Sequence, residues 1–394
     1  QTITLGDDVK TIGSNIFSKL SSLTSLTIGS GVTSIGSNAF GGATSITSIT
    51  IPDSVTTISS SAFSGLSSLE SITLGSGVTS IGANAFYGTA LTSLTIPDSV
   101  TSIGSSAFQD ATALTSLVIP DSVTSIGNDA FHGATGLTSV TFGSGVETIG
   151  NEAFKGTSSL TSVTIGSGVT SIGEQAFYGS GVTSVTIPDS VTSIGALAFA
   201  KVPIKTLVVG KGLPNQSSVG GGAFYGVCPT LESVSINSPN ALGRGDQRTK
   251  RFPWMTYVNG PYPSSHGDYS YQGLHFTQGS VSNYRYNYNG WQNTWGSPRD
   301  PASLFECENL QTITLGDDVK TVGSNIFSKL SSLTSLTIGS SVESIDIYQG
   351  LHFTQGSVNA AQVRNSFTNY IYRDQFGSPR DPASLFECEN LQTI

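Results

Sequence analysis

Charged side chains are scarce in this sequence. Asp, Glu, Lys and Arg make up 11% of its 394 residues, whereas an ordinary soluble domain has about a quarter. Apolar residues account for 37%, so most of the chain is uncharged and polar, with 46 glycines among the rest. The formal net charge of -9 would repel nucleic-acid phosphates, and no nucleic-acid partner is expected. This composition argues against a typical cytosolic enzyme.

Long hydrophobic runs and reactive side chains are also scarce. No stretch approaches the roughly 18 apolar residues that a membrane-spanning helix needs, so no membrane span is expected. The four histidines (His132, His266, His275 and His352) are too dispersed in the sequence to predict a metal site. Neither a nucleophile elbow nor a phosphate-binding glycine loop is present. We therefore predict no catalytic residue, no cofactor and no enzymatic activity.

An internal repeat is the dominant feature of the sequence. Ala-Phe, or Ile-Phe in the first instance, recurs at intervals of 22 to 25 residues, with its aromatic residue at Phe17, Phe40, Phe63, Phe86, Phe108, Phe131, Phe154, Phe177, Phe199 and Phe224. Each repeat reads Leu-x-x-Leu-x-Ile, then Gly-Ser-Gly or Pro-Asp-Ser, then Val-x-x-Ile-Gly, then Ala-Phe. This period and leucine spacing are typical of leucine-rich repeats. Stacking is obligatory, because one repeat cannot bury its apolar face alone.

The residues of one repeat predict its local structure. Leu-Thr-Ser-Leu-Thr-Ile is expected to be a short strand, with Leu26 and Ile28 on one face because they are two residues apart. Pro-Asp or Gly-Ser ends the strand in a turn. Val-Thr-Ser-Ile is expected to be a second short extended segment. Gly-x-x-Ala-Phe is predicted to form a 3₁₀ turn whose Phe enters the core.

The repeat resembles the BspA-like (Treponema-type) leucine-rich repeat family, whose repeats read Leu-x-x-Ile-x-Ile-Pro-x-x-Val-x-x-Ile-Gly-x-x-Ala-Phe-x-x-Cys. The resemblance covers residues 1–236, 302–345 and the last dozen residues. It implies a mainly β fold: a curved leucine-rich-repeat solenoid with a parallel β-sheet, coils of about 23 residues and two loop insertions. It also implies secretion or surface display and an adhesive or protein-binding role. The family has no shared catalytic residues to carry over.

Two segments interrupt the repeat. Both contain Tyr-Gln-Gly-Leu-His-Phe-Thr-Gln-Gly-Ser-Val, and both re-enter the repeat at its Phe (Phe305 and Phe386). We therefore interpret them as insertions into a coil, and loops on a rigid scaffold often carry function. The predicted organisation is leucine-rich repeats over 1–236, an aromatic-rich insertion over 237–301, repeats over 302–345, a second insertion over 346–382 and the start of a further repeat over 383–394.

A larger duplication suggests self-association. Residues 1–30 recur at 311–340 with one difference, Ile12 against Val322. The sequence ends in Asn-Leu-Gln-Thr-Ile and begins with Gln-Thr-Ile-Thr-Leu, without an initiator Met or a signal peptide. Two interpretations stay open: a fragment of a longer tandem array, or units that join head to tail. In either case the ends carry no polar capping repeat, and exposed strand edges favour filaments.

The three cysteines occupy one position of the repeat. Cys228, Cys307 and Cys388 each lie three residues before the first Leu of a strand, where the resembled family has its consensus Cys. One interpretation is a small buried filler. The alternative is a disulfide: if the first insertion decorates a single coil, Cys228 and Cys307 lie on adjacent coils, within the Cα separation that a bridge requires. Cys388 would then be free or would join another subunit.

The first insertion holds the candidate binding residues. Its aromatic residues alternate with Asn or Arg, which suits a protein interface or a sugar platform if the segment is a strand; a small core of its own is the other interpretation. These residues are Trp254, Tyr284, Tyr286, Tyr288, Trp291 and Trp295. Arg244-Gly245-Asp246 spells an integrin-type adhesion tripeptide. Outside the insertion, Asn215 begins an N-glycosylation sequon.

Ser and Thr recur in phase with the strands. One predicted row contains Ser25, Ser48, Ser71, Ser93, Ser116, Ser139, Ser162 and Ser184, and the next contains Thr27, Thr50, Thr73, Thr95, Thr141, Thr164 and Thr186. Such rows resemble the arrays of ice-binding β-solenoids. Pairing between neighbouring strands also explains them. We favour pairing, because leucine-rich-repeat sheets curve whereas ice is flat.

These observations lead to one predicted function and two alternatives. The main hypothesis is an extracellular or cell-surface, non-enzymatic scaffold whose partner is a second copy of itself, joined head to tail in a filament or matrix. The first alternative is a cell-surface adhesin that binds host or matrix proteins or glycans. The second is binding to ice or a crystalline surface.

Overall fold

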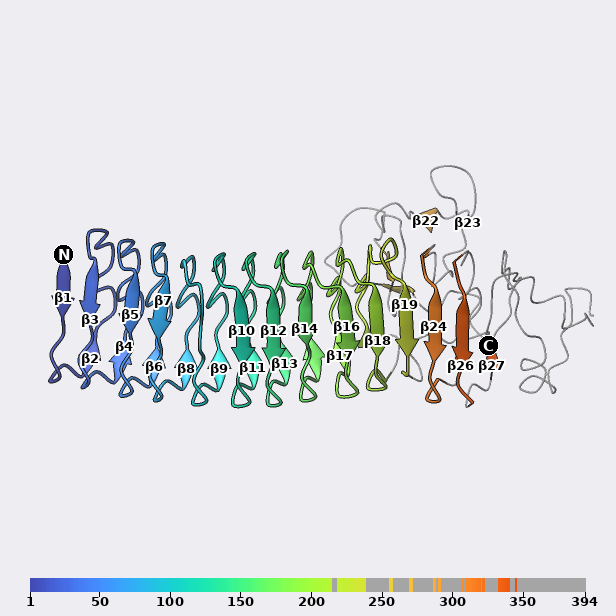
Figure 1. The fold of residues 1–394 in the computed structure, drawn as a ribbon, viewed down its shortest axis with the longest axis horizontal. Coiled ribbons are helices and arrows are strands. Elements are labelled where there is room, and N and C mark those ends of the chain that lie inside the picture. The colour runs from blue at the N-terminus through green and yellow to red at the C-terminus, as the bar shows by residue number, and fades with distance from the viewer. Residues whose placement is uncertain are drawn as a thin grey trace, which may run out of the picture. The chain divides into compact units, whose positions relative to one another are not determined.

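The computed structural model is an all-strand solenoid whose coils are the sequence repeats (Figure 1). It describes residues 1–214, 218–238, 255–257, 269–271, 286–287, 290–291, 307, 309–319, 321–322, 332–340 and 344–345. The chain forms two compact units, Gln1–Val202 (unit 1) and Pro203–Ile394 (unit 2), each treated by itself below. The predicted fold class, a leucine-rich-repeat β-solenoid with parallel strands, is confirmed. The described residues contain no α-helix.

Each coil of unit 1 contains a main strand formed by the Leu-x-x-Leu-x-Ile segment. In β3 the side chain of Leu26 is buried, whereas Ser25 and Thr27 are exposed, as the alternation of side chains along a strand requires. The segment 92–96 has the same sequence pattern but is not a strand. The main strands are β1 (Thr2–Thr4), β3 (Ser25–Thr27), β5 (Ser48–Thr50), β7 (Ser71–Thr73), β10 (Ser116–Ile119), β12 (Ser139–Phe142), β14 (Ser162–Thr164) and β16 (Ser184–Ile187).

Main strands pair in parallel with the next coil at a shift of one repeat. Ser116 lies opposite Ser139, and Ile119 opposite Phe142. Equivalent positions of the repeat therefore lie beside one another from coil to coil. The ladder shortens to the single pair Ser162–Ser184 between β14 and β16, where the coil is one residue shorter. The main strands of unit 1 form three groups: β1–β3, β5–β7 and β10–β12–β14–β16.

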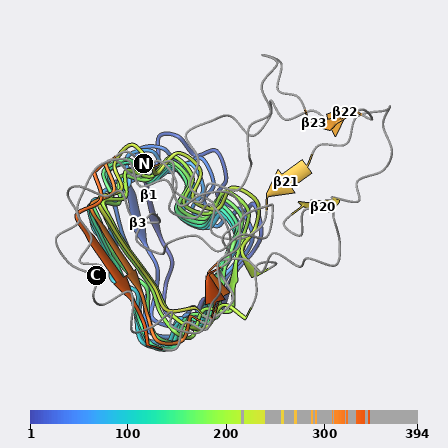
Figure 2. The ribbon, with the colours of Figure 1, turned by 90° about the vertical axis from the view of Figure 1, so that its right-hand side faces the viewer.

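A second, continuous sheet runs through unit 1. It is formed by the Val-x-x-Ile segments, which the sequence predicted as short extended segments, and all nine strands pair in parallel. The short strands lie on a different side of the coil from the main strands (Figure 2). They are β2 (Thr11–Ile12), β4 (Ser34–Ile35), β6 (Thr57–Ile58), β8 (Ser80–Ile81), β9 (Ser102–Ile103), β11 (Ser125–Ile126), β13 (Thr148–Ile149), β15 (Ser171–Ile172) and β17 (Ser193–Ile194).

Phenylalanines form a continuous stack through the core of unit 1. From Phe17 to Phe199, neighbouring rings have centroids 5.2–5.5 Å apart and planes within 19° of parallel. From Phe40 onwards these rings are fully buried. Stacked rings add to the energy of burial itself. The prediction that the Phe of each repeat enters the core is confirmed.

The turn that carries each Phe differs from the predicted 3₁₀ turn. We call this segment, from the Gly of Val-x-x-Ile-Gly to the second residue after Phe, the Phe turn. Its residue before Ala-Phe has a left-handed backbone, with a φ of 57° at Asp129 and 56° at Glu152. The second residue after Phe is also left-handed and is usually glycine, such as Gly133. A 3₁₀ turn needs negative φ values, so the prediction was wrong. The left-handed positions let the Phe turns stack with inter-coil hydrogen bonds, such as Phe131 N–H to the Ala153 carbonyl at 2.8 Å.

Lys19 occupies a position of the Phe turn where most coils have glycine. Its φ is 61° and its side chain is exposed. We expect Lys19→Gly to raise the free energy of unfolding by about 0.5–1 kcal/mol, because glycine avoids the left-handed penalty but costs chain entropy. Urea unfolding measures the change. Lys10→Gly is the control, since Lys10 is not left-handed and its replacement should destabilise. A lower stability for Lys19→Gly would contradict the assigned backbone.

Unit 2 continues the same architecture. Its main strands β18 (Thr206–Val209), β19 (Ser233–Ile236), β24 (Thr312–Leu315) and β26 (Ser335–Ile338) form a parallel sheet. β19 and β24 are 79 residues apart in sequence and pair directly, Ser233 with Thr312. This pairing supports our proposal that the first insertion leaves and re-enters the repeat. Short strands β25 (Thr321–Val322) and β27 (Ser344–Ile345) also pair in parallel.

Within the first insertion the structure describes two antiparallel pairs. They are β20 (Met255–Tyr257) with β21 (Tyr269–Tyr271), and β22 (Tyr286–Asn287) with β23 (Gly290–Trp291).

Candidate functional site: exposed rows, Phe-turn ridge and disulfide

The outer face of the main strands in unit 1 is an uncharged surface of hydroxyl groups. Ser116, Ser139, Ser162 and Ser184 follow one another in register and are exposed, which confirms that the predicted rows are structural neighbours. Val118 stands in the threonine row and is 64% exposed. The surface offers weak hydrogen-bonding groups and no fixed charge along its strands.

Threonines that precede the strands connect one coil to the next. The hydroxyl and the backbone N–H of Thr138 both donate to the carbonyl of Thr115, each at 2.9 Å. Thr192 repeats the arrangement on the short-strand side, with its hydroxyl donating to the Thr170 carbonyl at 3.2 Å. Because these donors are used within the solenoid, we interpret the threonines as stabilising the stack.

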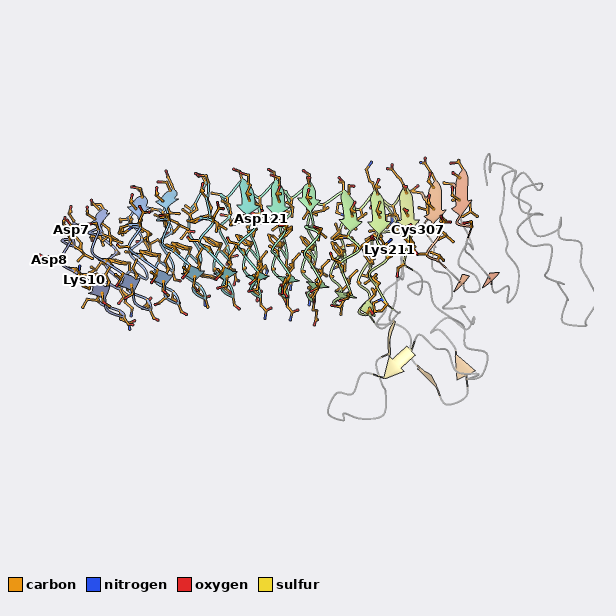
Figure 3. All side chains as sticks on the ribbon, turned by 90° about the horizontal axis from the view of Figure 1, so that it is seen from below. Asp7, Asp8, Lys10, Asp121, Lys211 and Cys307 are labelled. Carbon is orange, nitrogen blue, oxygen red and sulfur yellow. A yellow bond between two sulfur atoms is a disulfide. The ribbon has the colours of Figure 1, made fainter. Side chains whose placement is uncertain are left out.

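Aspartate and serine form a second link between coils, at the turn after the main strand. Asp121 Oδ1 accepts the Ser144 backbone N–H at 2.6 Å and the Ser144 hydroxyl at 3.0 Å. The same link joins Asp7 to Ser30, Asp53 to Ser76 and Asp317 to Ser340. Asp7 and Asp121 are labelled in Figure 3. The link forms where an Asp-containing turn is followed by a Gly-Ser turn one coil later, a signal that is present in the sequence.

Ser76→Ala tests this link through the titration of Asp53. The backbone N–H and then the hydroxyl of Ser76 lower the pKa of Asp53 below 3.8, so the link stabilises the fold above that pH and is lost as the pH falls through the lower value. Removing the hydroxyl should raise the pKa of Asp53 part of the way towards 3.8. An NMR titration of the Asp53 carboxyl carbon measures it, with Asp7 in the same spectra as the control. An unchanged Asp53 titration would contradict the link.

The Phe turns form a ridge that differs chemically from the hydroxyl surface. We call the exposed and half-buried side chains of these turns the Phe-turn ridge. Tyr87 lies next to Asp110, whose charge and hydrogen bond raise the pKa of the Tyr87 hydroxyl. Lys155 and Lys201 approach the ring of Tyr178, with Nζ atoms 5.7 and 5.3 Å from its centroid. Aromatic and charged groups therefore gather on this ridge, although the repeat around it is nearly uniform.

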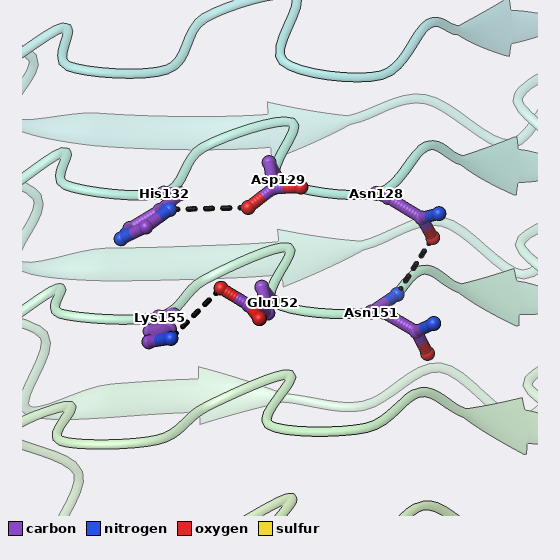
Figure 4. A network of polar contacts seen from close by, with 6 residues as sticks. All are labelled: Asn128, Asp129, His132, Asn151, Glu152 and Lys155. Atoms are coloured by element: carbon purple, nitrogen blue, oxygen red, sulfur yellow. Dashed lines mark hydrogen bonds and ion pairs between the residues drawn. The ribbon is translucent and has the colours of Figure 1, made fainter. Parts of the chain in front are cut away.

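One group on the ridge combines an imidazole with carboxylates. His132 Nδ1 lies 3.1 Å from Asp129 Oδ1, and Lys155 Nζ lies 2.8 Å from Glu152 Oε2 on the next coil (Figure 4). The ligand atoms of Asp129, His132 and Glu152 all lie within 4.8 Å of one another. Counting histidines in the sequence missed this group. The missed signal was the spacing of 23 residues between Asp129 and Glu152, which stacks the two carboxylates.

Cys228 and Cys307 meet in unit 2 and form a disulfide with Cα atoms 4.5 Å apart. Both are fully buried, so the position also has the filler character that the sequence suggested. Asn309 Nδ2 donates to the Pro229 carbonyl at 2.8 Å beside the bridge. Cys307 is labelled in Figure 3. The two residues flank the first insertion in sequence, so the bond ties its two ends together.

We expect this disulfide to be present in the protein purified from an oxidising compartment. Proteolysis without reductant, followed by mass spectrometry, should yield the Cys228 and Cys307 peptides as one linked species that separates on reduction. The Cys388 peptide in the same digest is the internal control for thiol reactivity. Full alkylation of Cys228 and Cys307 without prior reduction would refute the assignment.

The other sequence-predicted site residues are only partly described. Tyr286 and Trp291 lie opposite each other in the β22–β23 pair. The remaining aromatic candidates, the adhesion tripeptide, the sequon and the third cysteine lie outside the described residues: Arg244, Asp246, Trp254, Tyr284, Tyr288, Trp295, Asn215 and Cys388. Among the residues that are described, none belongs to a helix long and apolar enough to cross a membrane.

Comparison with solved structures gives the same fold. A leucine-rich repeat protein from Bacteroides ovatus ATCC 8483 is 23% identical, with a TM-score of 0.54, over 86% of this chain and 78% of that one. The pneumococcal vaccine antigen PcpA is 22% identical, with a TM-score of 0.40, over 60% of this chain and 67% of that one. A leucine rich cell surface protein from Faecalibacterium prausnitzii A2-165 is 26% identical, with a TM-score of 0.34, over 60% and 79%. No curated protein matches the chain.

The family comparison agrees with the repeat seen in the sequence and in the coils. The model of the BspA type leucine rich repeat region matches in six copies, over residues 1–115, 101–232 and 301–376. The matched segments include the stacked Phe turns, the parallel strands and the second copy of the first coil. This is a family of repeat scaffolds and not a known enzyme family. The chain belongs to the BspA-type leucine-rich repeat family.

Proposed function

We propose that this protein is an extracellular, non-enzymatic structural scaffold whose coils stack between chains as well as within one, so that copies join head to tail. Membership of a family of repeat scaffolds, typically surface proteins, supports the setting. The observation that carries the proposal is the behaviour of one coil sequence in two environments, at residues 1–30 and 311–340.

The second copy of this coil is covered by another coil. Ile313, Leu315 and Val319 are fully buried there, and β24 pairs with β19 on its upstream side. The Thr312 and Gly316 amides donate to carbonyls of the β19 coil at 3.1 and 2.9 Å. This sequence therefore forms a complete interface with an upstream coil.

In the first copy the same surface lacks a covering coil within the described part of the chain. Ile3, Leu5 and Val9 correspond to the three buried residues above but are only half-buried. A β-carbon at Gly6 or Gly13 would have no neighbour within 4 Å. Exposed strand edges with apolar side chains favour association. The surface is defined by the packing of its copy, whatever polypeptide precedes Gln1 in the whole protein, and we infer that a second copy covers it.

Gly13→Ala tests the assembly without disturbing the coil. At the same position of later coils, such as Gly36, a β-carbon would lie 2.7–2.8 Å from backbone atoms of the upstream coil. Alanine at residue 13 therefore fits this chain alone but obstructs a coil stacked upon it. We expect the unaltered chain to form linear oligomers that grow with concentration, and Gly13→Ala to stay monomeric with unchanged thermal stability.

Light scattering after gel filtration measures the mass, and negative-stain microscopy shows the shape. Val118→Thr, which alters the outer surface far from this edge in sequence, is the control and should assemble like the unaltered chain. Dispersed monomers of the unaltered chain at all concentrations, or equal assembly of Gly13→Ala, would exclude the proposal.

A binding module is the second candidate function. The observation that favours it is the Phe-turn ridge, where Tyr87, Tyr178 and several charged side chains interrupt an otherwise uniform surface. Protein or glycan partners would be recognised there or through the first insertion. Attachment assays that compare Tyr178→Ala with a deletion of residues 240–300 distinguish these locations. Unaltered attachment in both variants would reject them.

A further inference from the structure

We propose that Asp129, His132 and Glu152 bind a zinc ion on the Phe-turn ridge. These residues offer one imidazole nitrogen and two carboxylates, which are common zinc ligands. Their ligand atoms lie within 4.8 Å of one another. Within the described part of the chain, this is the one place where three His, Cys, Asp or Glu side chains converge in this way. The proposal does not depend on head-to-tail assembly.

The distances in the group are close to those of a metal site. Zinc–ligand bonds of about 2.0–2.2 Å place two tetrahedral ligands roughly 3.3 Å apart. His132 Nδ1 and Asp129 Oδ1 are 3.1 Å apart, so one ion can contact both with little movement. The Glu152 carboxylate has to approach them, because two ligands of one zinc ion cannot be farther apart than about 4.4 Å. Its three side-chain torsions allow this movement without a change of backbone.

The backbone beneath the three ligands is held firmly. Asn128 Oδ1 accepts the Asn151 backbone N–H at 2.9 Å, and Asn151 Oδ1 accepts the Glu174 N–H at 2.8 Å. The Asp129 N–H donates to the Asn151 carbonyl at 2.8 Å. The asparagine bond between the two coils is visible in Figure 4. Ligands on a rigid scaffold lose little conformational freedom when they bind a metal.

Lys155 balances part of the negative charge of the group and competes with the ion. Its ammonium group lies 2.8 Å from Glu152 and must leave that carboxylate when zinc binds. A second place for it exists, because the same Nζ lies 5.7 Å from the centre of the Tyr178 ring. Lys155 should therefore weaken zinc binding without preventing it. This gives the proposal a test in which a substitution strengthens binding.

The four side chains are each about one quarter to one third exposed, so an ion can reach them from solvent. The imidazole favours zinc over calcium or magnesium, which prefer ligand sets made of oxygen. Three protein ligands leave the fourth tetrahedral position to water.

Isothermal titration with zinc chloride tests the site in the full chain carrying Cys388→Ser, which removes a thiol that could also bind zinc. We expect His132→Ala and Glu152→Gln each to weaken one binding event roughly tenfold or more. Lys155→Met should tighten the same event several-fold. Glu174→Gln, on the following coil and outside the ligand group, is the matched control and should bind zinc like the Cys388→Ser chain.

Circular dichroism checks that each variant is folded, and His132→Gln provides a second test if His132→Ala unfolds. Zinc binding that is equal in the Cys388→Ser chain and in its folded His132 and Glu152 variants overturns the proposal. Absence of zinc binding in the Cys388→Ser chain and in its Lys155→Met variant overturns it as well.

Discussion

Replacing Phe131 with alanine is expected to lower the free energy of unfolding by about 3–5 kcal/mol, the usual cost of removing a buried aromatic ring. Phe131 is fully buried, and its ring stacks on Phe108 and Phe154 with centroids 5.3 Å away on each side. The substitution leaves a cavity and removes two ring contacts at once. Since each coil of a solenoid contacts only its neighbours, the damage should be centred on three coils.

Urea unfolding measures the overall loss, and hydrogen exchange locates it. Exchange should accelerate at the Phe108 and Phe131 amides, which donate to carbonyls of the next coil. Val118→Thr is the control: Val118 is 64% exposed, so its replacement should change stability by less than about 0.5 kcal/mol. Equal stability of Phe131→Ala and Val118→Thr would refute the role of the ring stack.

Gly150→Ala should destabilise the fold by about 3 kcal/mol, the upper end of the cost of overpacking. A β-carbon at Gly150 would lie 2.6 Å from the Gly127 carbonyl carbon and 2.7 Å from the Asn128 nitrogen. Both are backbone atoms, so no side-chain rotation relieves the overlap. The Gly150 amide also donates to the Ile126 carbonyl at 2.9 Å, and this bond fixes the spacing of the two coils. The alanine variant must therefore separate the coils or distort the turn.

Gly13→Ala is the matched control for Gly150→Ala, because both glycines follow the Ile of a short strand. At Gly13 the new methyl group meets no atom within 4 Å in the chain. We expect thermal unfolding to show a large decrease for Gly150→Ala and little change for Gly13→Ala. A similar decrease in both would mean that the glycine is required by its own backbone and not by the neighbouring coil.

Periodicity made the core predictable. The recurrence of Phe every 22 to 25 residues placed one ring in each coil, and the spacing of Leu26 and Ile28 placed both on the buried face of a strand. These predictions were correct because side-chain direction along a strand and the stacking of equal repeats depend on sequence spacing alone. The position shared by Cys228 and Cys307 was visible for the same reason.

The Phe turn and the ridge were not predictable in the same way. Asp129 and Glu152 adopt left-handed backbones although neither is glycine, so no local signal marked that conformation. The approach of His132 to two carboxylates depends on how the Phe turns of adjacent coils stack. Side chains that are three residues apart in one coil meet a side chain of the next coil, and a scan for local motifs does not detect such a group.

The sequence by itself determined the coil: its length, its buried positions and the family to which the chain belongs. The tertiary structure alone decided what each coil contacts. Ile3 and Ile313 stand in identical segments, yet Ile3 is half-buried whereas Ile313 is fully buried beneath the β19 coil. Burial in a solenoid is supplied by the neighbouring coil, so identical residues acquire different environments when their neighbours differ.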